Sequence, residues 1–64
     1  MKNRLKKIRE DEGISQEELS KKSSVSRTII SELENDKTNV ITNATLEKLA
    51  SALGKKVTDI FFQE

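Results

Sequence analysis

The sequence contains no cysteine, histidine, proline, tryptophan or tyrosine. Without cysteine, neither a disulfide nor a thiolate metal site is available. Without histidine, the chain lacks the commonest general base and the commonest metal ligand. The many serines and threonines therefore have no histidine to activate them, and no lysine is evidently paired with one of them for that purpose. We expect no enzymatic activity, no cofactor and no metal site.

Long apolar runs and glycine-rich segments are also lacking. No stretch approaches the ~18 apolar residues that a membrane-spanning helix needs. The basic first residues are not followed by the apolar segment of a signal peptide, and no glycine-rich phosphate loop is present. We therefore expect a cytoplasmic protein with no membrane partner and no small-molecule ligand. Its 64 residues predict a single domain, 1–64, of marginal stability.

The charges are nearly balanced but unevenly placed. The formal net charge is +1, yet residues 1–9 carry five basic groups and no acid. An uneven distribution of this kind can indicate an anionic partner. It is equally typical of a solvated first helix, and the charges alone do not separate these two interpretations.

Helix-start signals recur three times along the chain. Ser15 and Glu18 have the spacing of a capping box, and Ile14 and Leu19 have that of a hydrophobic staple. The same order of apolar, hydroxyl and apolar residues recurs in Val25, Ser26 and Ile30, and again in Ile41, Thr42 and Leu46. The pattern predicts helices that begin near residues 15, 26 and 42.

Two further helices complete the predicted fold. One precedes Gly13, and a short one spans 57–62 with apolar residues at helical spacing. The helix that begins near 42 ends at Gly54, since glycine is favoured just after a helix. No sustained alternation marks a strand. The prediction is an all-α, compact five-helix bundle, with a helix-turn-helix at about 15–35 because only residues 22–25 separate its two helices.

The helix that begins near residue 26 has two distinct faces. At ~100° per residue, Ile30 and Leu33 point into the core. The opposite face presents small or planar polar groups suited to base edges and phosphates, namely Thr28, Ser31, Glu32 and Asn35, with Arg27 at the edge. Ile29 lies about 70° from the core direction, which allows either a place at the core edge or contact with a thymine methyl group.

Four blocks of sequence carry a resemblance to a known family. They are GISQEELS at 13–20, VS at 25–26, ISELEN at 30–35 and TLEKLASALG at 45–54. Over residues 5–61 the chain resembles the Cro/C1-type (lambda-repressor-like, XRE-family) helix-turn-helix domain. The resemblance implies a sequence-specific transcriptional regulator, with its third helix in the major groove of double-stranded DNA. It also implies a repressor that binds a partly palindromic operator as a homodimer.

The resemblance also assigns roles to individual residues. Gln16 matches a phosphate-contacting glutamine, and Arg27 matches a position that either reads guanine or clamps a phosphate. Glu32 matches a base-reading position, where it either accepts from cytosine N4 or only repels wrong sequences. The expected DNA-binding residues are Gln16, Ser26, Arg27, Thr28, Ser31, Glu32, Asn35, Lys37 and Thr38.

Two structural pairings are implied by the same resemblance. Arg9 and Glu34 match a partly buried ion pair that joins the first helix to the end of the third. The last helical segment commonly forms the dimer contact in this family, which predicts a symmetric interface through Ile60, Phe61 or Phe62.

The sequence departs from the family pattern in the turns. Ser24 and Asp36 stand where the family usually has glycine, so each predicts a left-handed non-glycine residue or an altered turn. Asp36 also adds negative charge close to the expected DNA face. Together with Glu32 and the low net charge, it leaves open a second class of function, a protein-interaction module that has kept the fold and lost DNA binding.

Overall fold

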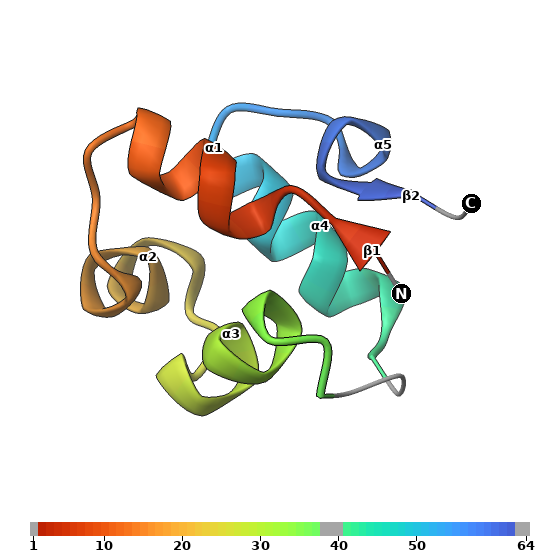
Figure 1. Cartoon of the computed structure of the whole chain (residues 1–64), viewed down its shortest axis with the longest axis horizontal. Coiled ribbons are helices and arrows are strands. Elements are labelled where there is room, and N and C mark those ends of the chain that lie inside the picture. Colours follow the sequence, from red (N-terminus) through yellow and green to blue (C-terminus); the bar gives the residue numbers. More distant parts are fainter. Residues whose placement is uncertain (1, 38–40, 63–64) are drawn as a thin grey trace.

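The computed structural model describes residues 2–37 and 41–62, and within them it contains five short helices and one pair of very short strands (Figure 1). In chain order the elements are β1 (Lys2–Asn3), α1 (Leu5–Asp11), α2 (Gln16–Ser23), α3 (Arg27–Glu34), α4 (Asn43–Ala52), α5 (Val57–Ile60) and β2 (Phe61–Phe62). The five-helix, all-α prediction is confirmed. Within the described ranges, no helix is long and apolar enough to cross a membrane.

Hydroxyl side chains cap three of the helices at the predicted positions. Ser15 accepts a hydrogen bond from the backbone N–H of Glu18, whose carboxylate in turn accepts from the backbone N–H of Ser15. Ser26 and Thr42 each accept from the backbone N–H three residues later. The capping pattern therefore located the starts of α2, α3 and α4 correctly.

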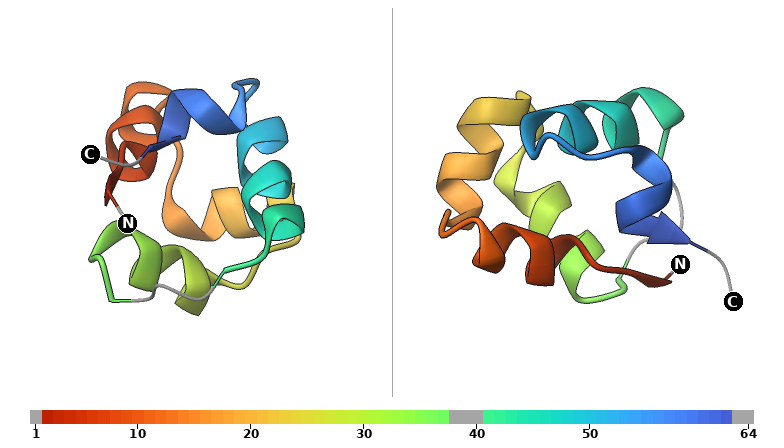
Figure 2. Two further views of the ribbon diagram at one scale, coloured as in Figure 1. Left: turned by 90° about the vertical axis from the view of Figure 1, so that its right-hand side faces the viewer. Right: turned by 90° about the horizontal axis from the view of Figure 1, so that it is seen from above.

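One apolar core lies between the helices, which surround it on all sides (Figure 2). The largest fully buried side chains come from all five helices, and they are Leu5, Leu19, Ile30, Leu33, Leu49 and Ile60. Each helix is too short to be stable alone in water. The orientation of α3, which carries most of the expected site residues, therefore depends on this shared core.

The C-terminal segment differs from the prediction. The helix expected over 57–62 ends at Ile60, and the next two residues form β2. They pair antiparallel with β1, in the register Lys2 with Phe62 and Asn3 with Phe61. A helical wheel cannot anticipate this pairing, because it depends on β1 and β2, which are far apart in sequence, lying side by side (Figure 1).

Candidate nucleic-acid interface

Serine side chains shape the turn between α2 and α3. The Ser20 hydroxyl donates to the carbonyl of Val25 at 2.7 Å, and the Ser23 hydroxyl donates to the carbonyl of Leu19 at 2.7 Å. Ser23 also accepts from the backbone N–H of Val25 at 3.2 Å. Ser24 takes the left-handed conformation, with φ of 61°. These bonds tie the turn to α2 and so help to fix the angle at which α3 leaves α2.

The predicted faces of α3 are present in the structure. Ile30 and Leu33 are buried, with exposed fractions of 0% and 2%. Arg27 and Thr28 are exposed at the start of the helix, while Ser31 and Glu32 are half-buried one turn later. The start of α3 therefore presents the Arg27 cation and the Thr28 hydroxyl to solvent. The carboxylate of Glu32 follows one turn later along the helix.

Six of the nine expected DNA-binding residues share one open hollow. It has a volume of about 350 Å³ and is lined by Gln16, Arg27, Thr28, Ser31, Glu32 and Lys37. Gln16 comes from the start of α2, Lys37 from the segment after α3, and the other four from α3 itself. Folding thus gathers residues that are up to 21 positions apart in sequence into a single surface.

The charged groups of this hollow have no partner within the described part of the chain. No ion pair or side-chain hydrogen bond involves Arg27, Glu32 or Lys37 there. Their charged ends are therefore available for an external ligand. Two cations beside one carboxylate favour an anion, and the carboxylate restricts which groups can approach.

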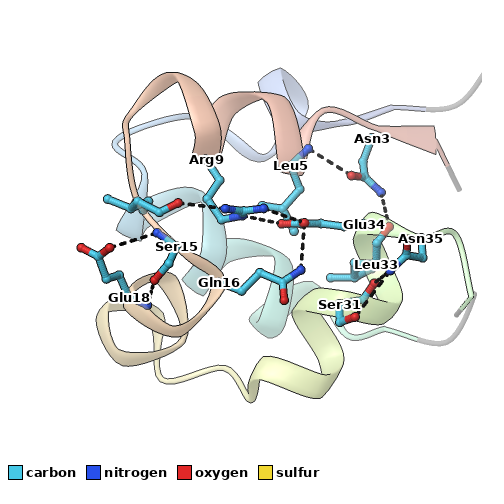
Figure 3. Close-up of polar contacts among 11 residues, drawn as sticks. Asn3, Leu5, Arg9, Ser15, Gln16, Glu18, Ser31, Leu33, Glu34 and Asn35 are labelled. Carbon is cyan, nitrogen blue, oxygen red and sulfur yellow. Dashed lines mark hydrogen bonds and ion pairs between the residues drawn. The ribbon is translucent and has the colours of Figure 1, made fainter.

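A buried ion pair connects α1 to the end of α3 (Figure 3). The guanidinium of Arg9 donates from Nε to Glu34 Oε2 at 2.8 Å and from Nη2 to Glu34 Oε1 at 3.0 Å. A third bond runs from Nη1 to the carbonyl of Ile14 at 2.9 Å. The two side chains are only 10% and 2% exposed. The pair expected from the sequence is therefore a two-bonded contact inside the molecule.

Glu34 also holds the side chain of Gln16. The Gln16 amide nitrogen donates to Glu34 Oε1 at 3.0 Å, so one carboxylate joins α1, α2 and α3 (Figure 3). Gln16 lines the hollow as well. Its amide therefore links the buried ion pair to the open surface.

The ion pair shifts the pKa values of both partners. Burial alone would raise the pKa of Glu34, but hydrogen bonds from Arg9 and Gln16 and the charge of Arg9 lower it below its ordinary value. The hydrogen bond to Glu34 raises the pKa of Arg9 despite its burial. Both groups are therefore held in their charged forms.

The other expected contact residues have local roles in the free protein. The Ser26 hydroxyl accepts from the backbone N–H of Ile29 at 3.2 Å as the cap of α3. The Asn35 amide donates to the carbonyl of Ser31 at 2.8 Å. Thr38 lies outside the described residues.

Two of the three residues expected at the dimer interface are buried within the single chain. Ile60 and Phe61 belong to the core of the single chain, with exposed fractions of 0% and 7%. An interface through Ile60, Phe61 or Phe62 stays a prediction, and the burial of the first two side chains limits what they can offer to a second copy. The backbone of Phe62 pairs with Lys2, and its side chain lies outside the described part.

The two side-chain hydrogen bonds of Asn3 were not predicted from the sequence. Asn3 accepts from the backbone N–H of Leu5 at 3.0 Å and donates to the carbonyl of Leu33 at 3.0 Å, so it ties the start of the chain to α3. An asparagine just before a helix is itself a capping signal, which could have revealed the first contact but not the second. Ile29 is exposed, whereas the sequence left its position open.

Comparisons with known proteins agree with this geometry. A family model described as helix-turn-helix matches residues 5–60, which is nearly the whole chain. The match includes the two helices of the hollow and every helix of the core. A search of curated proteins found no match.

Proposed function

Because the chain belongs to the Cro/C1-type (XRE) helix-turn-helix family and is a DNA-binding transcription regulator of that type, we propose that it is a sequence-specific repressor. In this proposal a homodimer binds a partly palindromic operator, with α3 of each subunit in a major groove. The hollow lined by six of the expected contact residues carries the proposal. The bound dimer represses by occupying a promoter, which requires no chemistry beyond binding.

The start of α3 supplies the proposed base contacts. Arg27 and Thr28 are exposed on its first turn, and the first residues of a recognition helix are those that reach base edges. The fork of Arg27 fits guanine O6 and N7, a contact worth ~1–3 kcal/mol of discrimination. Glu32, one turn later, either accepts from cytosine N4 or repels other bases.

Gln16 and the segment after α3 supply the proposed phosphate contacts. Gln16 is the first residue of α2, where free backbone N–H groups and the helix dipole favour an anion. Its amide is oriented by Glu34. Asn35 at the end of α3 and Lys37 just after it are exposed, and in the proposal they supply further phosphate contacts.

Selection from a pool of random duplexes, at low and at moderate salt, tests the proposal. We expect enrichment of a two-fold symmetric motif, with half-sites about one helical turn apart. Retention without an enriched motif, lost as salt rises, would instead show phosphate attraction alone.

Variants test whether the hollow is the binding surface. Arg27→Ala should weaken binding to the enriched motif by about tenfold or more. Lys55→Ala is the matched control, because Lys55 belongs to the connection between α4 and α5. That connection runs on the side of the molecule away from α3 (Figure 1). Equal losses from both variants would contradict the assignment of the surface.

A protein-interaction module is the alternative function. The observation that favours it is the exposed acid Asp36, which directly precedes the hollow-lining Lys37 in the chain. This alternative predicts no enriched motif and no steep salt dependence with any duplex. The same selection therefore separates the two proposals.

A further inference from the structure

Ile29 stands out on the surface of α3. Among the described side chains it is the large apolar one that is exposed, with an exposed fraction of 37%. The partly buried apolar residues that pack against the core are Ile8, Ile14, Ile41, Ala52 and Val57, and Ile29 is not one of them. More than a third of the Ile29 side chain is therefore open to an external ligand in the free protein.

We infer that Ile29 determines part of the DNA specificity by packing its side chain against the C5-methyl group of a thymine. This inference rests on the proposed function. The inference adds to the proposed function one contact residue, Ile29, and one recognised base, thymine. Thymine alone among the bases presents a methyl group in the major groove.

The position of Ile29 on α3 supports this role. It is the third residue of the helix, directly after Arg27 and Thr28, and so lies in the turn that approaches the bases. Its direction, about 70° from the core, places the side chain on the flank of the helix beside Glu32. Because Glu32 lines the hollow, the flank beside it enters the groove in the proposed complex.

The side chain is also held ready for such a contact. The backbone N–H of Ile29 donates to the Ser26 hydroxyl at 3.2 Å, which fixes the first turn. A β-branched residue in a helix has one strongly preferred χ1 rotamer. The Ile29 side chain therefore loses little rotational freedom when it packs against a thymine methyl group. The favourable free energy of removing apolar surface from water is then not offset by a large entropy cost.

Replacing thymine by deoxyuridine removes only the methyl group, and this provides the test. Using the motif enriched by the wild-type protein, each thymine is replaced in turn, symmetrically in both half-sites. We expect one position at which the wild-type affinity falls by roughly three- to fivefold per half-site, the value of about one buried methyl group. Other thymines should be insensitive.

Variants of Ile29 then test whether this side chain causes the sensitivity to the thymine methyl group. Val and Thr have nearly the same shape, so Ile29→Val should keep the preference for thymine over deoxyuridine and Ile29→Thr should largely lose it. Ile29→Ala should bind both duplexes equally. Circular dichroism melting should show that all three variants are folded at the temperature of the binding assay, since Ile29 is exposed.

The outcomes separate this inference from the proposed function. If a motif is enriched but no thymine is sensitive, or if Ile29→Ala keeps the full sensitivity, Ile29 does not read a methyl group and only this inference fails. If no motif is enriched from the pool, both the inference and the proposed function fail.

Discussion

At the scale of residues, the Glu34 carboxylate joins three helices through two partners, Arg9 and Gln16. The resemblance of the sequence to its family predicted the ion pair, because Arg9 and Glu34 both match positions of such a pair in the family. It did not lead to the bond from Gln16, since that bond depends on how α2 approaches α3. Within the described residues every buried polar side-chain atom has a partner, so removing one member leaves others unpaired.

Breaking this ion pair from one side should strongly destabilise the protein. Arg9→Ala or Glu34→Ala leaves a buried charge without its partner, and each should cost about 3–5 kcal/mol. For a domain of this size such a loss approaches the whole stability. Urea unfolding followed by circular dichroism measures it.

An exposed ion pair provides the control. Lys7 and Asp11 are 3.9 Å apart with side chains 76% and 67% exposed, so Lys7→Ala should cost less than about 0.5 kcal/mol. The double variant Arg9→Met with Glu34→Leu should be more stable than either alanine variant. A double variant as unstable as the sum of the single ones would argue against a coupled pair.

The lowered pKa of Glu34 predicts how stability depends on pH. Its carboxyl takes up a proton at a higher pH in the unfolded chain than in the folded one. The contribution of Glu34 is therefore complete above the ordinary value of 4.5 and is lost as the pH falls below it toward the lowered folded-state value.

Urea unfolding of the wild-type protein and of Glu34→Gln at a series of pH values measures this contribution. The stability of Glu34→Gln should vary less between about pH 5 and pH 3. Parallel curves for the two proteins would show that the ionisation of Glu34 does not contribute.

At the scale of elements, the sequence predicted helix starts better than helix ends. Hydroxyl caps and apolar residues at fixed spacing act within one turn, so Ser15, Ser26 and Thr42 could be identified directly. The end of α5 could not, because β2 forms only through its pairing with β1. The hollow likewise needs the approach of α2 to α3, which no local pattern contains.

The left-handed residue between α2 and α3 gives a prediction about the turn. Ser24 has φ of 61°, a conformation that costs most residues roughly 1–2 kcal/mol and glycine almost nothing. Ser24→Gly should therefore stabilise the protein by about 0.5 kcal/mol, after the greater freedom of the unfolded chain is deducted.

Thermal melting checks the turn prediction against a matched substitution. Ser51 is exposed within α4, so Ser51→Gly should destabilise by about 0.5 kcal/mol. A loss of stability in both variants would mean that the strain at Ser24 is already relieved by its neighbours.

At the scale of the whole molecule, the central proposal is a dimer that matches a symmetric site. Since Ile60 and Phe61 are buried in the single chain, Phe62 is the remaining candidate among the three residues predicted for the interface. Its neighbour Phe61 offers a contrast, because Phe61 belongs to the core of the single chain.

Charge placed at these two positions should have different effects. Phe62→Lys should give a folded monomer, because it disrupts the proposed contact between subunits, whereas Phe61→Lys should unfold the chain by placing a charge in the core. Sedimentation equilibrium and circular dichroism distinguish the two results. A Phe62→Lys protein with the same mass in solution as the wild-type dimer would move the interface elsewhere.

The most direct measurement of sequence-specific binding is the ratio of two affinities at moderate, fixed salt. One duplex carries the motif enriched from the random pool, and the other has the same composition in scrambled order. Specific regulators bind their sites ~10³–10⁷-fold more tightly than other DNA, so we expect a ratio of at least about a thousand. Equal affinity for both duplexes would contradict sequence-specific binding by this surface.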